Sequence, residues 1–224
     1  MTGWTAVVPV KPWGLAKSRL DLPDDDRMRL ARAFSLDVLD VVLAAASVDR
    51  VVVVTAEAEL GAIARRRGAA VLTDRPMLAR GLLNRAVDAG RQWAKINAAG
   101  APIVVVPGDL AALDAGVLDA TLGLLAQQER AFVPDASGMG TTLLAAARPE
   151  LLIPAYGERS AMHHSDAGYR AVPQVDKRCR RDVDTAADLA EARALGVGPH
   201  TIAALEQMTS AIREGRDRMR MPAG

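Results

Sequence analysis

The sequence predicts an α/β fold in which a mixed, mostly parallel sheet is covered by helices on both faces. In the first half of the chain, short apolar runs of strand length alternate with longer segments of helical periodicity. That alternation is typical of parallel strands buried on both faces. After residue 130 it stops, and two strand-like runs flank a glycine-containing turn instead. This change indicates that part of the sheet is not built from crossovers.

The expected strands are short runs rich in valine, isoleucine and alanine. The first extends from Thr5 to Val10, and the prolines Pro9 and Pro12 lead it into a loop. The remaining strands are expected at 51–55, 70–73, 103–106, 131–133 and 141–146. The turn PDASGMG joins the last two.

Helices are expected between these strands because apolar residues there recur every three or four positions. The acidic run Asp24–Asp26 suits the start of the first helix, which presents apolar residues as far as Ala45. Asp184 or Thr185 is expected to cap a later helix that stops at Gly196. The other helices are expected around 60–63, 82–93, 117–125 and 199–213.

Length and composition indicate one domain. Half of the 224 residues are hydrophobic, which is enough for a single sizeable core. We expect this domain to occupy residues 1–215. Residues 216–224 show no core pattern and are expected to form a disordered tail.

Charge and cysteine content restrict the possible partners and location. The 28 basic and 27 acidic residues are interspersed, so no strongly basic face is available for nucleic acid or an anionic membrane. No apolar run approaches the roughly 18 residues of a membrane span, and the first residues lack the layout of a signal peptide. The single cysteine, Cys179, fits a reducing compartment. We therefore expect a cytoplasmic protein without nucleic-acid or membrane partners.

Polar residues directly follow two of the expected strands, where ligands bind in open parallel sheets. After the first strand, PVKPWGLAKSRL contains Lys11, Lys17 and Arg19, which could surround a triphosphate with cationic donors. A solvated basic loop would have the same composition. Asp109 follows the strand at 103–106, where its carboxylate could meet a ligand-bound cation or simply cap a helix.

A third group is the acidic pair Asp182 and Asp184 in RRDVDT. If this stretch is extended, the two side chains share one face and their carboxylates converge. Converging carboxylates repel each other unless a cation lies between them, and Mg²⁺ accepts such oxygens together with substrate phosphates. The alternative is a capping pair at the start of the following helix. Combined with Asp109, the pair is more specific for a metal site than either part alone.

Six segments, taken in order and spacing, resemble the guanylyltransferases of deazaflavin coenzyme (coenzyme F420) biosynthesis. These segments are PVKPWGLAKSRL, GLLNRAVDAG, VPGDL, PDASGMGTTLL, YGERSAMHH and RDVDTAADLAEARALGVG. The resemblance extends to about His200. It implies a Rossmann-like fold related to nucleotide-diphospho-sugar transferases, GTP as donor, Mg²⁺ as cofactor, and a homodimer.

The resemblance also implies an acceptor, which in this family is phosphoenolpyruvate, 2-phospho-L-lactate or 3-phosphoglycerate. Abundant arginine and alanine are typical of GC-rich genomes such as those of actinobacteria, and this favours phosphoenolpyruvate. The implied reaction transfers GMP from GTP to the acceptor phosphate and releases pyrophosphate. A phosphomonoester is already anionic near neutral pH, since its second pKa is about 6, so no general base is required.

Roles for individual residues follow from the same resemblance. The catalytic residues are Lys17, Arg19 and Asp109, and the metal ligands are Asp109, Asp182 and Asp184. The nucleotide-binding residues are Pro9, Lys11, Gly81, Asn84 and Gly108. The acceptor-binding residues are Gly140, Thr141, Gly157 and Ser160. Small hydroxyls and exposed backbone amides suit an anionic acceptor.

The chain departs from the family pattern in two places. Ala111 stands where the family has a proline, which alters the rigidity of that loop. GLLN contains one more leucine than usual, which affects the role expected for Asn84. One of His163 and His164 matches a family histidine, expected in the structure or in the acceptor pocket. Four parts of the chain could supply the apolar contacts of a homodimer: Trp4, Trp13, residues 151–153 and the last helix.

Three other readings fit parts of the sequence. Another nucleotidyltransferase, or a glycosyltransferase with DVD as its metal motif, would act on a sugar hydroxyl and would need a base that the sequence does not obviously provide. A non-catalytic module would bind GTP without releasing pyrophosphate. A structural or interaction protein would leave the polar residues after the strands unexplained.

Overall fold

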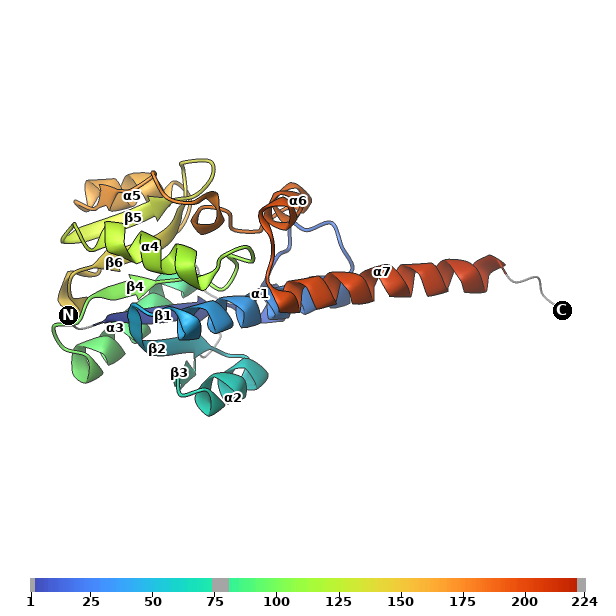
Figure 1. Ribbon diagram of the computed structural model, residues 1–224, viewed down its shortest axis with the longest axis horizontal. Helices are drawn as coiled ribbons and strands as arrows, with labels where there is room; N and C mark the ends of the chain where they lie inside the picture. The colour runs from blue at the N-terminus through green and yellow to red at the C-terminus, as the bar shows by residue number, and fades with distance from the viewer. Residues whose placement is uncertain (1–2, 74–80, 221–224) are drawn as a thin grey trace.

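The computed structural model describes residues 3–73 and 81–220, of which 211–220 as backbone alone. A seven-stranded sheet lies at its centre (Figure 1), with strand order β3-β2-β1-β4-β6-β5-β7. The strands are β1 (Trp4–Val10), β2 (Val48–Thr55), β3 (Ala70–Thr73), β4 (Ile103–Val105), β5 (Arg130–Pro134), β6 (Thr141–Ala146) and β7 (Arg170–Ala171). The helices are α1 (Asp24–Ala44), α2 (Ala58–Arg66), α3 (Leu82–Asn97), α4 (Ala115–Leu125), α5 (Ser160–Asp166), α6 (Ala186–Leu195) and α7 (Pro199–Arg220).

Strand pairing confirms the predicted mixed, mostly parallel sheet. β1 lies between β2 and β4 and pairs with both in parallel, and β3 and β7 also pair in parallel with their neighbours. β6 is antiparallel to both β4 and β5. The reversal occurs at the turn PDASGMG, where the alternation of strands and helices ends in the sequence.

Helices cover both faces of the sheet, as predicted. Alternate residues of β1 enter opposite layers: Ala6 and Val8 pack with α1, α2 and α4, whereas Val7 packs with α3. Both faces of the strand are therefore buried, which accounts for its continuous apolar run. Gly90 of α3 lies so close to Val7 that a side chain at this position would collide with the valine.

Pro9 lies inside β1, and its position explains how the sheet opens. Thr5 donates its N–H toward β4 and Val7 accepts from Val106, so the odd-numbered residues of β1 bond on that side. Pairing between β1 and β4 ends at Val7. The N–H that proline lacks would thus point to the side where β4 has already diverged, so no ladder hydrogen bond is lost. The two strands separate there and leave room for a ligand site.

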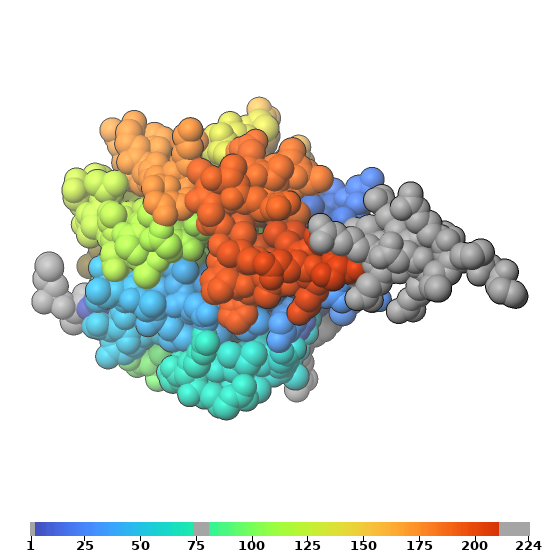
Figure 2. All heavy atoms as spheres, turned by 45° about the vertical axis from the view of Figure 1, so that its right-hand side comes forward, coloured from blue at the N-terminus to red at the C-terminus, as the bar shows by residue number. Residues whose placement is uncertain are grey.

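A third apolar cluster joins the C-terminal segments to α1. It includes Phe34 of α1, Ala111, Val183 and Ala192 of α6, together with Met208 of α7. Figure 2 shows α6 and the first turns of α7 packed on the body of the molecule beside α1, and Figure 1 shows that α7 then projects away from it. Of the helices that the structure describes, none is long and apolar enough to cross a membrane.

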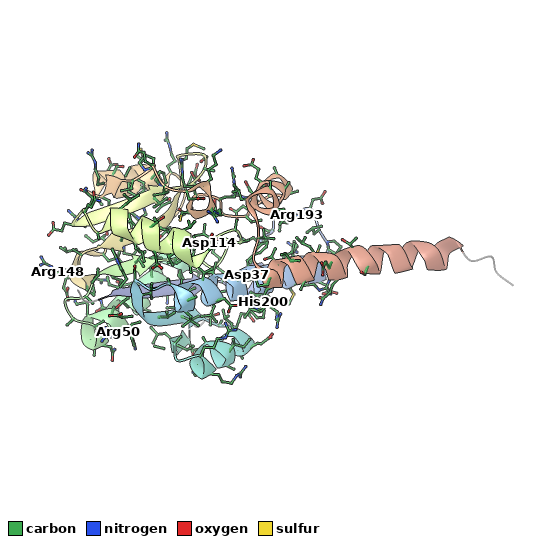
Figure 3. All side chains as sticks on the ribbon, viewed as in Figure 1. Asp37, Arg50, Asp114, Arg148, Arg193 and His200 are labelled. Atoms are coloured by element: carbon green, nitrogen blue, oxygen red, sulfur yellow. The ribbon has the colours of Figure 1, made fainter. Side chains whose placement is uncertain are left out.

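The buried carboxylate of Asp37 fixes the start of α7 on α1. Although only 2% exposed, Asp37 accepts hydrogen bonds from the backbone N–H groups of His200 and Thr201, both at 2.9 Å, and from the hydroxyl of Thr201 at 2.6 Å. Asp37 and His200 adjoin each other where the two helices meet (Figure 3). A side chain on α1 thereby satisfies the free donors at the first turn of another helix.

The last helix corrects one expectation. Its expected end is Arg213, but α7 extends to Arg220, while the domain boundary at 215 and the disordered tail at 216–224 remain predictions. Arginine, methionine and glutamate favour helix, and a single interior glycine costs only about 1 kcal/mol, so Gly215 does not end it. Residues 221–224 lie outside the described residues. The short elements α5 and β7 were not predicted.

Two residues expected as dimer contacts are part of the core. Trp4 and Trp13 are each only 7% exposed and pack with α1 and the sheet. Neither can present apolar surface to a second chain. Tryptophan is often assigned to interfaces because it is large and amphipathic, but both of these indoles fill the interior.

We predict that Asp37→Ala lowers the free energy of unfolding by about 2–4 kcal/mol, because two backbone donors and a hydroxyl lose their acceptor in a buried place. Urea unfolding followed by circular dichroism measures the change. Asp40→Ala is the matched control one turn along α1. Asp40 pairs with Arg67 and His200 near the surface, so its loss should cost less than about 1 kcal/mol. Equal losses in the two variants would contradict this account of how α7 is attached.

Candidate active site

A cavity of about 220 Å³ opens beyond the carboxyl ends of β1 and β4. It brings together most of the residues predicted to bind nucleotide and metal, although they come from distant parts of the sequence. Its lining contains Pro9, Lys11, Lys17, Arg19, Gly108, Asp109 and Asp184, with Trp13 and Leu83 among its apolar residues. Of the residues predicted for the nucleotide, Gly81 and Asn84 are not part of this lining.

Lys17 is the centre of the polar part of the cavity. Its side chain is 7% exposed, and its ammonium lies 2.8 Å from Asp109 Oδ2 and 3.1 Å from Asp184 Oδ1. Burial disfavours the charge of Lys17, but the attraction of the two carboxylates and their hydrogen bonds outweigh it, so the pKa of Lys17 is raised. The lysine is therefore fully charged at neutral pH. Its backbone φ of 58° is unusual for a residue with a side chain and places this group inward.

Asp182 completes a set of three carboxylates around this point. Val183, between the two acids, is fully buried and donates its N–H to the carbonyl of Asp109 at 3.2 Å. Burial, followed by the charges of Asp109 and Asp184, raises the pKa of Asp182. The three acids therefore lie near enough to one another for their charges to interact.

The helix cap beside the acids resolves an ambiguity in the sequence. Thr185, not Asp184, is the N-cap of α6, and it forms a reciprocal capping box with Asp188. The carboxylate of Asp184 is therefore free to pair with Lys17, and at a longer 3.9 Å with Arg19, whose side chain is 77% exposed. Asp182 and Asp184 thus are not simply a capping pair.

The three carboxylates suit a divalent cation in charge but do not enclose one as they stand. Within residues 3–73 and 81–220, no group of three or more His, Cys, Asp or Glu side chains is arranged to hold a metal ion. The ammonium of Lys17 lies between Asp109 and Asp184, where it balances one of three negative charges. The remaining negative charge and the oxygen donors are those that Mg²⁺ prefers.

The loop that carries Asp109 is held from both sides by backbone hydrogen bonds. Besides the bond from Val183, the carbonyl of Ala111 accepts the N–H of Gly198 at 3.0 Å. Ala111 is fully buried in the third apolar cluster, so this packing fixes the loop where the family has a proline. Gly198 precedes α7, which links the position of Asp109 to the docking of that helix.

Trp13 forms one wall of the cavity, a role that the sequence did not reveal. Its backbone N–H donates to the carboxylate of Glu57 at 2.7 Å, and its indole Nε1 donates to the hydroxyl of Ser35 at 3.2 Å. Gly108 lies opposite, where a Cβ would come within 2.8 Å of Val10 Cγ2. The close approach of β1 to the Asp109 loop thus requires glycine at this position.

Asn84 corrects one of the predicted nucleotide contacts. Its amide nitrogen donates to the carbonyl of Tyr156 at 2.9 Å, and its amide oxygen accepts the N–H of Tyr156 at 2.8 Å. The side chain therefore holds the loop at 153–157 instead of facing the cavity. Leu83, the residue before it, lines the cavity instead.

The residues predicted to bind the acceptor lie on two loops outside this cavity lining. Asp135 holds the turn before β6 by accepting from Ser137 and from the N–H of Met139, and a Cβ at Gly140 would come within 2.5 Å of its Oδ2. On the second loop, Gly157 has a φ of 145°, and Ser160 is buried at 2% exposure, away from solvent.

Thr141, at the start of β6, is bound to His164. The ring of His164 is fully buried among Phe132, Tyr156 and Tyr169, its Nδ1 lies 2.9 Å from Thr141 Oγ1, and its Nε2 accepts the N–H of Ala155 at 3.0 Å. Burial, with a smaller contribution from the charge of His163, lowers the pKa of His164 to about 4. His164 is thus neutral and serves the structure around Thr141.

Comparison with known proteins agrees with this geometry. Residues 4–219 match the family described as "Guanylyl transferase CofC like". The chain belongs to this guanylyl transferase family. The phosphoenolpyruvate guanylyltransferase of Streptomyces coelicolor is 41% identical over 212 residues, covering 93% of this chain and 98% of that protein. The enzyme of the same name from Salinispora arenicola is 41% identical over 204 residues, covering 88% and 91%.

Solved structures confirm the fold of this CofC-like chain. A putative nucleotide-diphospho-sugar transferase from Desulfovibrio desulfuricans G20 superposes with a TM-score of 0.66 and 19% identity, covering 96% of this chain and 98% of that one. The fold and the family implied by the six sequence segments are both confirmed. The chain is accordingly an enzyme of the nucleotidyltransferase class.

The neutral state of His164 predicts a pH dependence of stability. The unfolded chain takes up a proton on this histidine below about pH 6.5, whereas the folded chain does so only near pH 4. Protonation therefore favours unfolding, and roughly 3 kcal/mol of stability should be lost as the pH falls from about 6.5 to 4.

Urea unfolding of wild type and His164→Gln across this pH range measures the effect, and the variant should show a shallower loss. The exposed neighbour variant His163→Gln is the control and should retain most of the wild-type slope. Parallel pH profiles for wild type and His164→Gln would show that the histidine is not buried in its neutral form.

Proposed function

We propose that this enzyme transfers GMP from GTP to the phosphate of phosphoenolpyruvate and releases pyrophosphate, as a step of deazaflavin coenzyme (coenzyme F420) biosynthesis. The observation that carries the proposal is the group of three aspartates and a buried lysine at the carboxyl ends of β1 and β4. The names of the relatives from Streptomyces coelicolor and Salinispora arenicola support phosphoenolpyruvate as acceptor.

Asp109, Asp182 and Asp184 are the residues that would hold Mg²⁺. Once bound, the ion would neutralise charge on the phosphates and draw donor and acceptor together. The three carboxylates come from two segments, the loop after β4 and the stretch before α6, which the bond between Val183 and Asp109 fixes to each other. The two acidic segments are thus held together before any substrate arrives.

Lys17 and Arg19 serve the triphosphate. Two unit charges about 4 Å apart interact with roughly 4 kcal/mol at an effective dielectric near 20, so an anionic acceptor cannot approach a triphosphate without compensating cations. Arg19 is exposed at the mouth of the cavity, and Lys11 is exposed beside it. In this proposal Lys17 turns from the carboxylates toward the phosphates and, with Arg19, stabilises the departing pyrophosphate.

No side chain needs to act as general base. The acceptor phosphate is an anionic nucleophile near neutral pH. His164, which contacts both of the loops predicted to bind the acceptor, has both ring nitrogens engaged and a pKa near 4, so it accepts no proton from substrate in the neutral range. A sugar hydroxyl, by contrast, would require a base. The site therefore favours a phosphorylated acid over a sugar as acceptor.

The first experiment measures pyrophosphate release by the purified protein with Mg²⁺ and each of GTP, ATP, CTP and UTP, crossed with three acids. These are phosphoenolpyruvate, 2-phospho-L-lactate and 3-phosphoglycerate. We expect release that requires both GTP and phosphoenolpyruvate and stops when EDTA removes the metal. Pyrophosphate release with only one of the other two acids would show that this acid, and not phosphoenolpyruvate, is the acceptor. No release from a folded protein that binds GTP would contradict the proposal and favour a non-catalytic module.

In the same assay Asp109→Asn should lose roughly 100-fold or more of turnover while remaining folded, because one metal-ligand charge is worth several kcal/mol in the transition state. Asp88→Asn is the control, since Asp88 forms an ion pair with Arg91 on α3 and is not part of the cavity lining. Near-normal turnover of Asp109→Asn would remove this residue from the metal site.

A further inference from the structure

A chain of hydrogen bonds determines which way the hydroxyl of Thr141 can point. The first link is the N–H of Ala155, which can only donate, and it donates to Nε2 of His164 at 3.0 Å. An imidazole nitrogen that accepts a hydrogen bond carries no proton. The proton of the neutral ring must therefore be on Nδ1.

The second link transfers this constraint to the threonine. Nδ1 of His164 lies 2.9 Å from Thr141 Oγ1 and, as the protonated nitrogen, is the donor. The hydroxyl oxygen accepts, so its own hydrogen must be directed elsewhere. In the described part of the chain, Thr141 Oγ1 makes no other hydrogen bond. Thr141 is half-buried at the start of β6, directly after the turn that contains Gly140.

We propose that His164 is a positioning residue for the acceptor, because by donating to Thr141 Oγ1 it keeps the hydroxyl hydrogen of Thr141 directed away from the ring and available to an anionic oxygen of the substrate. This inference rests on the proposed function and adds a means of selecting the acceptor. A hydroxyl without such a partner can spend its hydrogen on a neighbouring acceptor, whereas this one offers it to carboxylate or phosphate oxygens. His164 itself does not touch the substrate.

The surroundings of His164 keep the arrangement rigid. Phe132, Tyr156 and Tyr169 lie with ring centroids 5.3–5.8 Å from the imidazole, so the ring has no space to turn over. The loop at 153–157, which His164 holds at Ala155, is held at two further points. The hydroxyl of Tyr169 accepts the N–H of Ile153 at 2.6 Å, and the amide of Asn84 binds the backbone of Tyr156. His164 thus connects both acceptor loops, the one before Thr141 and the one at 153–157.

Two substitutions separate the two hydrogen bonds of the ring. The amide nitrogen of an asparagine falls near Nδ1, so His164→Asn keeps a donor for Thr141 and loses the acceptor for Ala155. The amide oxygen of a glutamine falls near Nε2, so His164→Gln keeps the acceptor for Ala155 and loses the donor for Thr141. Both changes remove the aromatic ring, which makes them matched controls for packing.

We expect His164→Gln to raise the KM for phosphoenolpyruvate roughly five- to tenfold, the effect of one misdirected hydrogen bond. The KM for GTP and kcat should stay within about twofold, and His164→Asn should have an acceptor KM closer to wild type. In a Thr141→Val background, His164→Gln should add no further increase, because the group through which it acts is gone. Equal effects of the two His164 variants, or additive effects with Thr141→Val, would overturn the inference.

The same measurements distinguish this inference from the proposed function. If wild type transfers GMP but His164→Gln keeps the wild-type acceptor KM, the inference alone fails. If wild type transfers GMP to no acid, the proposed function fails and the inference fails with it. Should the variants not fold, ¹⁵N NMR of the wild-type imidazole decides: protonated Nδ1 with bare Nε2 at pH 7 supports the inference, and protonated Nε2 overturns it.

Discussion

The balance of charge around Lys17 is the constraint on which the site depends. The Lys17 ammonium lies within 3.1 Å of the carboxylates of Asp109 and Asp184. Burial and then the charges of these two carboxylates raise the pKa of a third, Asp182. The chain accepts a left-handed backbone at Lys17, a conformation that costs on the order of 1–3 kcal/mol, to place this group there. An arrangement of three carboxylates around one ammonium is suited to gain a cation, because Mg²⁺ prefers oxygen ligands of this kind.

Elements outside the sheet hold Lys17 and the acidic residues around it in place. The loop of Asp109 is tied to Val183 on one side and to Gly198 on the other, and Gly198 is fixed because Asp37 caps the following helix. The loops predicted to bind the acceptor are held in a comparable way by Asn84, His164 and Tyr169. Arg159, beside the buried Ser160, has a φ of 55°, so strained backbone occurs in the acceptor region as well as at Lys17.

The sequence predicted most of the fold because its strands are continuous apolar runs and its helices are strongly periodic, both of which are local signals. It also predicted that Lys17 and Asp109 lie at one edge of the sheet, since both follow parallel strands, and the family resemblance added Asp184 to the same site. Three side-chain roles could not be predicted: the bond of Asn84 to the loop at 153–157, the place of Trp13 in the cavity wall, and the capping of α7 by Asp37. Their hydrogen-bond partners lie 22 to 164 positions away in the sequence, and no local pattern marks them. The expected end of α7 lies too early because the residues from 216 on show no core pattern, although the helix continues to Arg220.

Binding of Mn²⁺, as a spectroscopic substitute for Mg²⁺, to the nucleotide-free protein tests the central claim most directly. In Lys17→Met the competing ammonium is gone and three carboxylates remain, so affinity for Mn²⁺ measured by electron paramagnetic resonance should rise by tenfold or more, on the order expected for one unit charge about 4 Å away. Lys11→Met, a change in an exposed lysine of the same loop, should leave it unchanged. Unchanged or weaker Mn²⁺ binding by Lys17→Met would show that Lys17 does not occupy the place of the metal.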